Sequence, residues 1–440
     1  MMTTMASSKK TFSYVICPFC GSTCDDLEVT VENGKVTTRG GCSTSLSKFG
    51  NYDVERPLTP LVKKDGELRE SSYEEAIRRS AEILANAKYP LLYGWGSTCN
   101  EAVRTGLELA EWVGGVMDNT ATFCHGPSLL ASQEVGMVTG TLGEAVHQAD
   151  LVIYWGSNPV HSHPHHVMRY SALGKGRFRS SRKERTMVVV DVRKTDSAKL
   201  ADQFIQVAPN GDYELMCALR MAVRGDELEQ DVIAGVPAER IEELAELMIS
   251  CEFGVLFFGL GLTATEGRHR NVDVALSLVR DLNARTKFLI FPMRGHFDIT
   301  GACQVSAWVT GYPYAVDLSQ GYPRYNPGDT TTMDILARED CDAALVIAAD
   351  AVSNFPVEAT RHLAKVPVIT IDPHTSPTAL ISEVVFPSTF VGIETGGVIY
   401  RMDGVALMTK PVVSPPPGVH SDVEILQDIL SQVKKLKTGQ

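Results

Sequence analysis

Seven short runs of apolar residues constrain the fold of this chain more than any other feature. They occupy residues 91–93, 151–155, 187–191, 254–258, 288–291, 343–348 and 368–372, and several of them precede an amphipathic helical pattern. A strand that is apolar throughout is covered on both faces, as in a parallel sheet between layers of helices. The sequence therefore predicts an α/β fold with two doubly wound, largely parallel sheets.

The ends of these runs indicate where a ligand would bind. Most runs end in Gly, Asp, Asn or Pro, and glycine-rich turns follow three of them at residues 94–97, 156–158 and 259–261. In doubly wound folds ligands bind at the carboxyl ends of strands, and pyrophosphates favour glycine-rich turns and helix N-termini. Asp191, at the end of one run, could bind a ribose hydroxyl or a guanine edge. A single Gly-x-Gly is more often a plain turn, so the glycines alone do not define the ligand.

A set of four cysteines lies near the start of the chain, beside a predicted β-hairpin at residues 27–31 and 35–38. Cys17, Cys20, Cys24 and Cys42 have the spacing C-x2-C-x3-C-x17-C. Three thiolates on one loop and a distant fourth can ligate a [4Fe–4S] cluster. The three-residue gap departs from the paired C-x2-C arms of a zinc ribbon, but structural zinc remains the alternative.

Cys124 is followed by His125, Gly126 and Pro127, a sequence typical of a turn. On a turn the sulfur can face a cleft, although a buried unreactive thiol is the more common fate of a lone cysteine. Four histidines at positions 161, 163, 165 and 166 could bind a metal, but we expect them to line a cleft or the surface.

Composition excludes several classes of function. The formal charge of −12 over 440 residues argues against a nucleic acid or an anionic membrane surface as partner. No apolar run is long enough to cross a membrane, and the N-terminal residues do not form a signal peptide. We therefore expect a cytoplasmic protein whose ten cysteines bind metal or stay reduced.

The order of several motifs resembles that of the molybdopterin oxidoreductase superfamily, whose members bind two pterin guanine dinucleotides. Within it, the chain is most similar to the B subunits of formylmethanofuran dehydrogenases, over nearly its whole length. After the four cysteines, the resemblance is carried by residues 56–63, 72–76, 155–159, 190–195, 201–202, 209–212, 371–373 and 394–401. Each segment is weakly specific, whereas their joint order is highly specific.

The resemblance implies a role for each candidate residue. Cys124 would ligate molybdenum or tungsten, His125 would follow it as in formate dehydrogenases, and Arg294 would match their active-site arginine. An arginine can hold a carboxylate, and a histidine can transfer protons or donate hydrogen bonds. From the strand ends and the resemblance together, we expect the two molybdopterin guanine dinucleotides to contact Gly156, Asn158, Pro159, Asp191, Arg193, Thr195, Asp212, Gly259, Gly261, Gly396 and Gly397.

The implied function is that of a redox subunit. It would reduce CO2 to formate with electrons from the [4Fe–4S] cluster, and another subunit would condense the formate with methanofuran in methanogenesis. The implied partners are a small β-barrel subunit, an amidohydrolase-like subunit and ferredoxin-like subunits. Lys48 would lie between cluster and pterin, although many relatives place this lysine closer to the fourth cysteine.

We expect an iron–sulfur domain at 1–60, a discontinuous α/β domain at 61–145 and 300–412, a second α/β domain at 146–299 and a tail with a helix at 413–440. The chain ends before a C-terminal β-barrel of the kind found in many superfamily members, so we expect a separate subunit to supply it. Two alternatives remain: a formate dehydrogenase-like catalytic subunit, and a non-redox scaffold of a formyltransferase/hydrolase complex.

Overall fold

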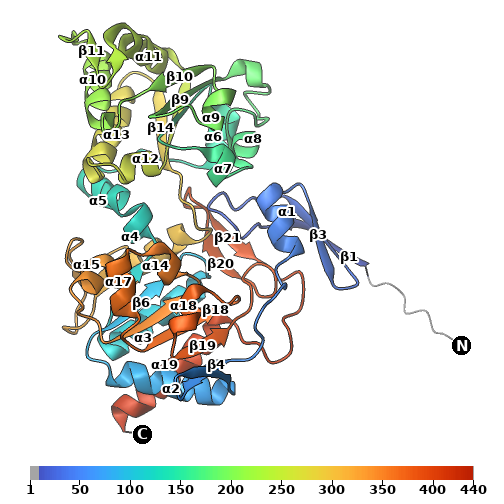
Figure 1. Ribbon diagram of the computed structural model, residues 1–440. Coiled ribbons are helices and arrows are strands. Elements are labelled where there is room, and N and C mark those ends of the chain that lie inside the picture. Colours follow the sequence, from blue (N-terminus) through green and yellow to red (C-terminus); the bar gives the residue numbers. More distant parts are fainter. Residues whose placement is uncertain (1–8, 440) are drawn as a thin grey trace, which may run out of the picture.

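The computed structural model describes residues 9–439, in which the apolar strands form the centres of two separate sheets (Figure 1). All seven expected strands are present, so the mixed α/β prediction with parallel sheets is confirmed. Both sheets carry helices on both faces, because their strands are apolar on both sides.

The five-stranded sheet is entirely parallel, and its strands come from one continuous part of the chain. Its order is β10(Gln203–Gln206), β9(Thr186–Asp191), β8(Leu151–Trp155), β13(Phe253–Phe258) and β14(Lys287–Pro292). One face packs on α10(Asp212–Arg224), α11(Ala238–Ser250) and α13(His269–Leu282), and the other on α6(Leu142–Gln148), α8(His166–Tyr170) and α9(Asp196–Leu200). The strand order reverses between β8 and β13, where doubly wound folds bind ligands.

The nine-stranded sheet draws its strands from both sides of that continuous part. Its parallel centre has the order β7(Val116–Asn119), β6(Pro90–Gly94), β17(Ala343–Ile347), β18(Val368–Asp372) and β19(Val384–Pro387). Antiparallel pairs form its edges: β15(Val316–Asp317) with β16(Arg324–Tyr325), and β4(Leu61–Lys64) with β5(Glu67–Glu70). Here the order reverses between β6 and β17.

Alternate residues of the central strands point to opposite faces of this sheet. Leu92, Leu345 and Ile369 pack against α2(Tyr73–Asn86), α3(Asn100–Val113), α14(Ile299–Thr310) and α19(Asp422–Thr438). Leu91, Val346 and Val368 pack against α15(Thr332–Ala337), α16(Ala351–Asn354) and α17(Val357–Leu363). Helix α18(Pro377–Ile381) follows β18 in the chain and packs against α16. The sequence pattern did not single out the four-residue strands β7, β10 and β19; polar residues make up half of β7 and half of β10.

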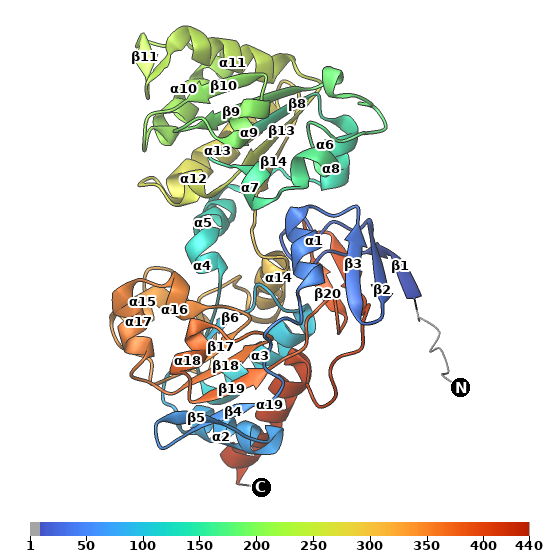
Figure 2. The same cartoon turned by 45° about the vertical axis from the view of Figure 1, so that its right-hand side comes forward.

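A small antiparallel sheet of β1(Lys9–Val15), β2(Leu27–Glu32) and β3(Lys35–Arg39) lies beside the two lobes (Figure 2). The expected hairpin is therefore present, with its turn at Asn33 and Gly34. The side chains of Leu27 and Val29 join the core that continues beneath the five-stranded sheet. This core fixes the unit against the rest of the molecule.

The chain crosses between the two lobes at two places. The first crossing carries α4(Ala121–Cys124) and α5(Gly126–Val135), and α5 packs against α13 of the upper lobe (Figures 1 and 2). The second is the segment 293–298 between β14 and α14. The three residues predicted to be catalytic, Cys124, His125 and Arg294, all lie on these crossings.

In the part of the chain that the structure describes, no helix combines the length and the apolar character that a membrane span requires.

We predict that Gly261→Ala destabilises the fold. A Cβ at Gly261 would lie 2.4 Å from the Cα of Gly156, so the turns after β8 and β13 would be forced apart. We expect a loss of about 1–3 kcal/mol in the free energy of unfolding, measured by denaturant titration of the purified chain.

Gly143→Ala is the matched control, because its Cβ would meet nothing closer than Thr141 Oγ1 at 3.5 Å, within α6. This control should gain about 0.4–1 kcal/mol in stability. Equal stability of the two variants would contradict the close approach of the turns.

Candidate active site

The four N-terminal cysteines converge because one loop folds back on itself. Cys17, Cys20 and Cys24 lie on the loop between β1 and β2, and the Cys17 N–H donates to the Cys24 carbonyl at 2.8 Å. Cys42 directly precedes α1(Ser43–Gly50) and follows β3. The structure thus brings together four residues that the spacing predicted as ligands of one metal group.

The environment of these thiols is apolar and crowded with sulfur. Burial, together with the neighbouring Cys20 and Cys42, raises the pKa of Cys17 to about 12. Burial and the same kind of neighbours also raise the pKa of Cys24. Within residues 9–439, no three His, Cys, Asp or Glu side chains converge tightly enough to hold a single metal ion. A lone tetrahedral zinc would require sulfurs about 3.8 Å apart, given Zn–S bonds of about 2.3 Å.

Cys124 ends α4 and is partly buried at the first crossing between the lobes. Burial raises the pKa of its thiol to about 11, while the N–H of Gly295 and the charge of Arg294 act in the opposite direction. The sulfur therefore has a hydrogen-bond donor and a cation beside it, both supplied by the second crossing.

His125 is fully buried next to this sulfur, and its Nε2–H donates to the Met293 carbonyl at 3.2 Å. Burial lowers the pKa of His125 to about 3, and the charge of Arg294 adds to the effect. The imidazole is therefore neutral at physiological pH. It acts here as a hydrogen-bond donor to the second crossing.

Arg294 is a buried guanidinium without an acidic partner. It is 9% exposed, and its Nη1 donates to Thr300 Oγ1 at 3.1 Å. Among the described residues, no carboxylate lies within ion-pair distance of it. Burying an unpaired charge is costly, so such a group is prepared to receive an anion.

The cysteine loop touches this arginine directly. The Gly21 N–H donates to the Gly295 carbonyl at 2.9 Å. A Cβ at Gly21 would lie 2.1 Å from the Arg294 carbonyl oxygen, so only glycine permits this approach. The predicted cluster loop and the predicted catalytic crossing are therefore in contact.

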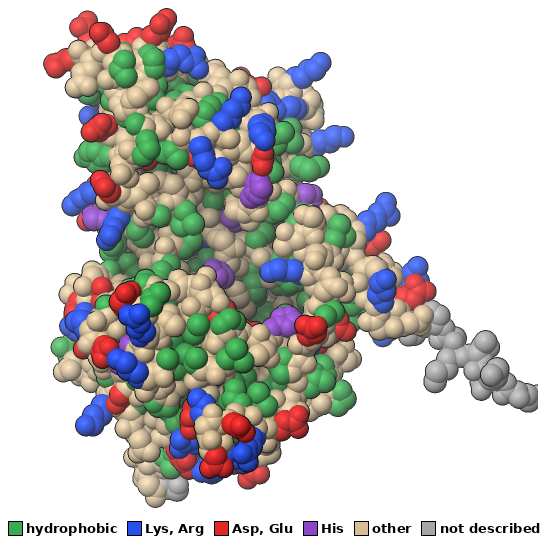
Figure 3. All heavy atoms as spheres, viewed as in Figure 1, with side chains coloured by type: hydrophobic (Ala, Val, Ile, Leu, Met, Phe, Trp, Pro, Cys, Tyr) green, Lys and Arg blue, Asp and Glu red, His purple; other side chains and the backbone are tan. Residues whose placement is uncertain are grey.

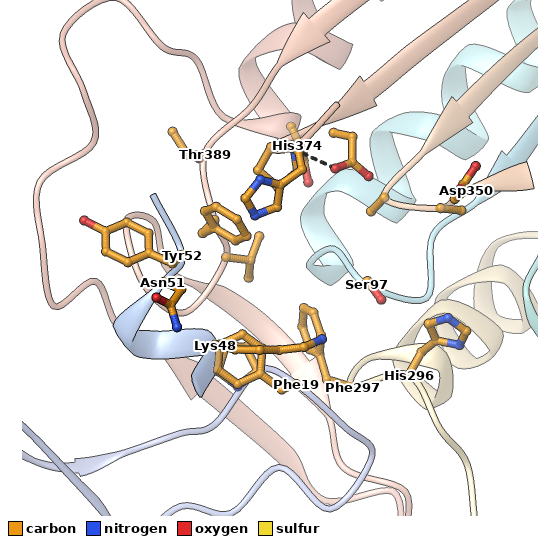
Figure 4. A pocket seen from close by; sticks show the side chains of 18 of the residues that line it. Phe19, Lys48, Asn51, Tyr52, Ser97, His296, Phe297, Asp350, His374 and Thr389 are labelled. Atoms are coloured by element: carbon orange, nitrogen blue, oxygen red, sulfur yellow. Dashed lines mark hydrogen bonds between the residues drawn. The ribbon is translucent and has the colours of Figure 1, made fainter. Parts of the chain in front are cut away.

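A cavity of about 740 Å³ lies between the N-terminal unit and the carboxyl edge of the nine-stranded sheet (Figure 4). Figure 3 shows the surface hollowed between the lobes, with histidine side chains around the hollow. Phe19, Lys48 and His296 line the cavity on one side, and Asp350 and His374 line it on the other. It opens at the reversal point between β6 and β17, where the fold predicts a ligand.

Sequence reasoning missed two residues that line this cavity, Asp350 and His374. Their signal was their position two residues after the predicted strands at 343–348 and 368–372. Ser97 and Asp372, which also line it, lie in the turn 94–97 and the segment 371–373 that the sequence singled out. Burial raises the pKa of Asp372 to about 7, so this carboxyl sits in a desolvated place suited to a hydrogen-bonding ligand.

Lys48 lines this cavity with its Nζ 5.4 Å from the centre of the Phe19 ring. Its charge acts on the thiol of Cys20 and also on the ring of His296. The lysine therefore lies electrostatically between the cysteine loop and the cavity, despite its unusual distance from Cys42 in sequence.

In the five-stranded lobe, the predicted glycines pack against each other. The Gly261 N–H donates to the Gly156 carbonyl at 2.9 Å, and a Cβ at Gly259 would lie 2.6 Å from that same oxygen. This close packing is one reason for glycine at these positions, and Pro159 begins α7(Pro159–Ser162) directly behind the turn.

The predicted polar residues of this lobe have different hydrogen-bond partners. Asn158 Oδ1 accepts from Ser197 Oγ at 2.6 Å, and the Thr195 hydroxyl caps α9. Asp191 accepts from the N–H of Arg193, whose side chain is exposed. These contacts place all four residues at the carboxyl edge of β8 and β9.

The remaining residues predicted to contact the dinucleotides are Asp212, Gly396 and Gly397. Asp212 Oδ1 accepts from Trp155 Nε1 at 2.7 Å, whereas its buried Oδ2 has no partner among the described residues. A Cβ at Gly396 would meet the Thr409 carbonyl at 2.6 Å, and one at Gly397 would meet Cys99 at 2.5 Å. The last two glycines thus pack against neighbouring chain rather than line the large cavity.

The site residues fit a large dinucleotide with a metal at its end. The cavity is roomy, and the buried oxygens Asp212 Oδ2 and Asp422 Oδ1 lack partners in the described chain. Such acceptors suit the N–H edge of a base or ribose hydroxyls. At the crossing between the lobes, Cys124 offers a thiol and Arg294 a cation, which suits a soft metal and an anionic substrate.

The four histidines at 161–166 have separate environments. His161 is exposed and pairs with Asp196 at 2.6 Å. His163 is buried, and its Nε2–H donates to the Arg294 carbonyl at 2.8 Å. His166 is buried against the Tyr154 hydroxyl. They do not form a common metal site within the described residues.

Comparison with known proteins places this geometry in a family. The molybdopterin oxidoreductase family model matches residues 56–432. The chain is 48% identical to the B subunit of tungsten-containing formylmethanofuran dehydrogenase 2 from Methanocaldococcus jannaschii, over 96% of this chain and 98% of that protein. It is 47% identical to the B subunit of the enzyme of the same name from Methanococcus maripaludis, over 97% and 99% of the two chains.

More distant similarities are found in sequence and in structure. Formate dehydrogenase H of Escherichia coli is 25% identical over 68% of this chain and 48% of that protein. The formyltransferase/hydrolase complex (FhcABCD) of Methylorubrum extorquens contains a chain that matches with a TM-score of 0.69 at 22% identity, over 86% of this chain and 99% of that chain. Acetylene hydratase of Pelobacter acetylenicus matches with a TM-score of 0.74 at 14% identity, over 96% of this chain and 69% of that chain.

The near full-length identity and the family match agree with the observed fold. The chain belongs to the molybdopterin oxidoreductase family and, within it, to the B subunits of formylmethanofuran dehydrogenases.

Proposed function

We propose that this chain is the subunit that interconverts CO2 and formate in a formylmethanofuran dehydrogenase complex. The reaction takes up two electrons and one proton: CO2 + 2 e⁻ + H⁺ → HCO2⁻. The observation that carries the proposal is Arg294, a buried guanidinium beside the Cys124 sulfur with no carboxylate partner within residues 9–439.

Arg294 would bind the substrate carboxylate. A guanidinium presents paired N–H donors that match the two oxygens of formate. One of the Arg294 nitrogens is held by Thr300 Oγ1, which leaves the others to donate to a substrate. Because the side chain is buried, such bonds would be stronger than in water.

His125 would contribute through hydrogen bonding. Its low pKa, caused first by burial, makes it a poor proton acceptor near neutral pH. Its Nε2–H holds the Met293 carbonyl and so helps to fix the crossing that carries Arg294. Of the two roles expected for this histidine, the hydrogen-bonding role fits the geometry better.

Cys124 would ligate tungsten or molybdenum held by two pterin guanine dinucleotides. When bound, this group supplies two-electron redox chemistry. Metal binding would overcome the raised pKa of the thiol, because a coordinated sulfur loses its proton. One dinucleotide would occupy the large cavity near Asp350 and Asp372. The other would lie against Gly156, Asn158, Pro159, Asp191, Arg193, Thr195, Asp212, Gly259 and Gly261, with Gly396 and Gly397 supporting the first site.

Cys17, Cys20, Cys24 and Cys42 would ligate one [4Fe–4S] cluster. Their sulfurs affect each other's pKa, so these thiols lie near one another. The spacing C-x2-C-x3-C-x17-C suits a cuboidal cluster better than the paired arms of a zinc ribbon. The hydrogen bond from Gly21 to Gly295 would connect the cluster loop with the catalytic crossing.

The wider assembly is part of the same proposal. We infer that the four segments predicted from the sequence act as an iron–sulfur domain, two dinucleotide-binding domains and a C-terminal helix. The close relatives are named as subunits, and one structural neighbour belongs to a complex of four kinds of subunit. A small β-barrel subunit, an amidohydrolase-like subunit and ferredoxin-like subunits would cover the cofactors, use the formate and deliver electrons.

Two alternatives have specific support. The likeness to a chain of the formyltransferase/hydrolase complex favours a non-redox scaffold, and the relationship to formate dehydrogenase H favours a formate dehydrogenase-like subunit. A scaffold would not need a buried cation beside a buried thiol, which is why the redox function is preferred.

Replacing Cys124 by Ala in the whole complex should abolish CO2 reduction and formate oxidation, because the metal would lose its protein sulfur. Condensation of added formate with methanofuran should continue. Cys217→Ala is the matched control, because Cys217 lies on α10 away from the crossings. Formate oxidation at the unmodified rate in the Cys124 variant would reject the proposed role of this residue.

Arg294→Lys should raise the KM for formate about 10- to 100-fold, because lysine keeps the charge but cannot donate a paired set of hydrogen bonds. Steady-state formate oxidation with a viologen acceptor measures this effect. Arg270→Lys, at a surface ion pair with Glu134, should leave the KM unchanged. An unchanged KM in the Arg294 variant would show that another group binds the carboxylate.

Anaerobic reconstitution of the chain with iron and sulfide should give about four irons per chain and the electron paramagnetic resonance signal of a reduced [4Fe–4S] cluster. Cys24→Ser should lose this signal, and Cys217→Ser should retain it. Stoichiometric zinc without iron in the native complex would instead establish the structural zinc alternative.

A further inference from the structure

The peptide unit between Arg294 and Gly295 is held on both of its polar sides. Its carbonyl accepts from His163 Nε2–H at 2.8 Å. Its N–H lies beside the sulfur of Cys124 and acts to lower the pKa of that thiol, against the larger effect of burial. The imidazole of His163 is thus connected to the sulfur through one peptide plane.

Three consecutive carbonyls of this crossing are bound by three different parts of the molecule. The Met293 carbonyl accepts from His125, the Arg294 carbonyl from His163 and the Gly295 carbonyl from the Gly21 N–H. His125 belongs to the first crossing, His163 to the five-stranded lobe and Gly21 to the cysteine loop. Segment 293–298 is therefore hydrogen-bonded to all three of these parts.

The geometry defines the tautomer of His163. A carbonyl can only accept, so Nε2 must carry the hydrogen. Nδ1 lies 2.9 Å from Ser162 Oγ, which can donate to it. His163 is 1% exposed, and its own N–H closes α7 by donating to the Pro159 carbonyl at 2.9 Å. The ring is therefore oriented from both sides.

The crossing needs such an anchor because of its glycine. No atom lies within 4 Å of the position that a Cβ on Gly295 would take. A glycine with open space beside it can adopt many backbone conformations. The Arg294 side chain has a hydrogen bond to Thr300 alone among the described residues, so its direction depends on how its peptide is held.

We propose that His163 is a positioning residue that fixes the Arg294–Gly295 peptide and thereby sets both the direction of the Arg294 side chain and the position of the Gly295 N–H beside the Cys124 sulfur. Donation to the carbonyl polarises the peptide and strengthens its N–H as a donor. Hydrogen bonds to a metal-bound sulfur tune the potential of the metal. The proposal rests on the proposed function, because it assigns His163 a part in formate binding and in metal tuning.

The neighbouring histidines provide the contrast. His161 pairs with Asp196 at the surface, and His166 bonds the Tyr154 hydroxyl in the core. Neither has a hydrogen bond to residues 293–296 in the structure. His163 is thus distinguished from its neighbours by its partner as well as by its burial.

The test compares His163→Leu, His163→Gln and the control His161→Gln in the complete complex, with metal and iron quantified in each. Glutamine carries an amide N–H near the position of Nε2, whereas leucine has no donor. Three quantities are measured: hydrogen exchange of peptides covering 17–24 and 293–300, the midpoint potential of the metal signal, and kcat and KM for formate oxidation.

In His163→Leu we expect faster exchange in both peptides, a shifted midpoint potential and a fall of about 10- to 100-fold in kcat/KM, mainly through KM. His163→Gln should restore most of each quantity, and His161→Gln should match the wild type. Unchanged exchange and potential in His163→Leu, or no recovery in His163→Gln, would overturn the proposal.

A wild-type complex that is fully loaded yet fails to oxidise formate would overturn the proposed function instead. The exchange and potential comparisons would still decide the role of His163, because neither depends on turnover.

Discussion

The close approach of Gly21 to the Arg294–Gly295 peptide is the contact on which the arrangement of this molecule depends. Only glycine can bring a backbone this near to the Arg294 carbonyl. It joins the cysteine loop to the crossing that carries the buried arginine, while His125 from the first crossing and His163 from the five-stranded lobe bind the same segment. Backbone and imidazole hydrogen bonds thus join the cysteine loop, the two crossings and the five-stranded lobe at one place.

The electrostatics of the crossing are unusual for a protein interior. A guanidinium is buried without an acidic partner in the described chain, next to a thiol whose pKa is raised by the same burial. Structural ion pairs elsewhere in the molecule, such as Arg56 with Glu394, are buried with their partners. Arg185 is also buried without a carboxylate but donates to four backbone carbonyls, whereas Arg294 has a hydrogen bond to Thr300 alone among the described residues.

The two sheets bring their ligand edges to the same place although their strand orders differ. In one, the order reverses between β8 and β13, and in the other between β6 and β17. The carboxyl ends of the reversed strands carry Gly156, Ser97 and Asp350. A doubly wound sheet offers a ligand site at each such reversal, so the two sheets offer two such sites.

The sequence by itself determined the strands, the hairpin and the spacing of the cysteines. Strands such as 151–155 and 254–258 are encoded locally, because every residue in them is apolar and must be buried. Short strands such as β7 have no such local signal, since Asp118 and Asn119 make up half of it. The resemblance to a family singled out Cys124 and Arg294 but could not say what surrounds them.

Only the tertiary structure decided how distant residues meet. His125 and Met293 are 168 positions apart, and their contact depends on two crossings between lobes whose geometry no local pattern encodes. The packing of distant elements also gives three nearby histidines different partners: His161, His163 and His166. It likewise brings Gly156 and Gly261 into contact. Apolar periodicity specifies which residues are buried, whereas the packing of whole elements specifies which buried polar groups find each other.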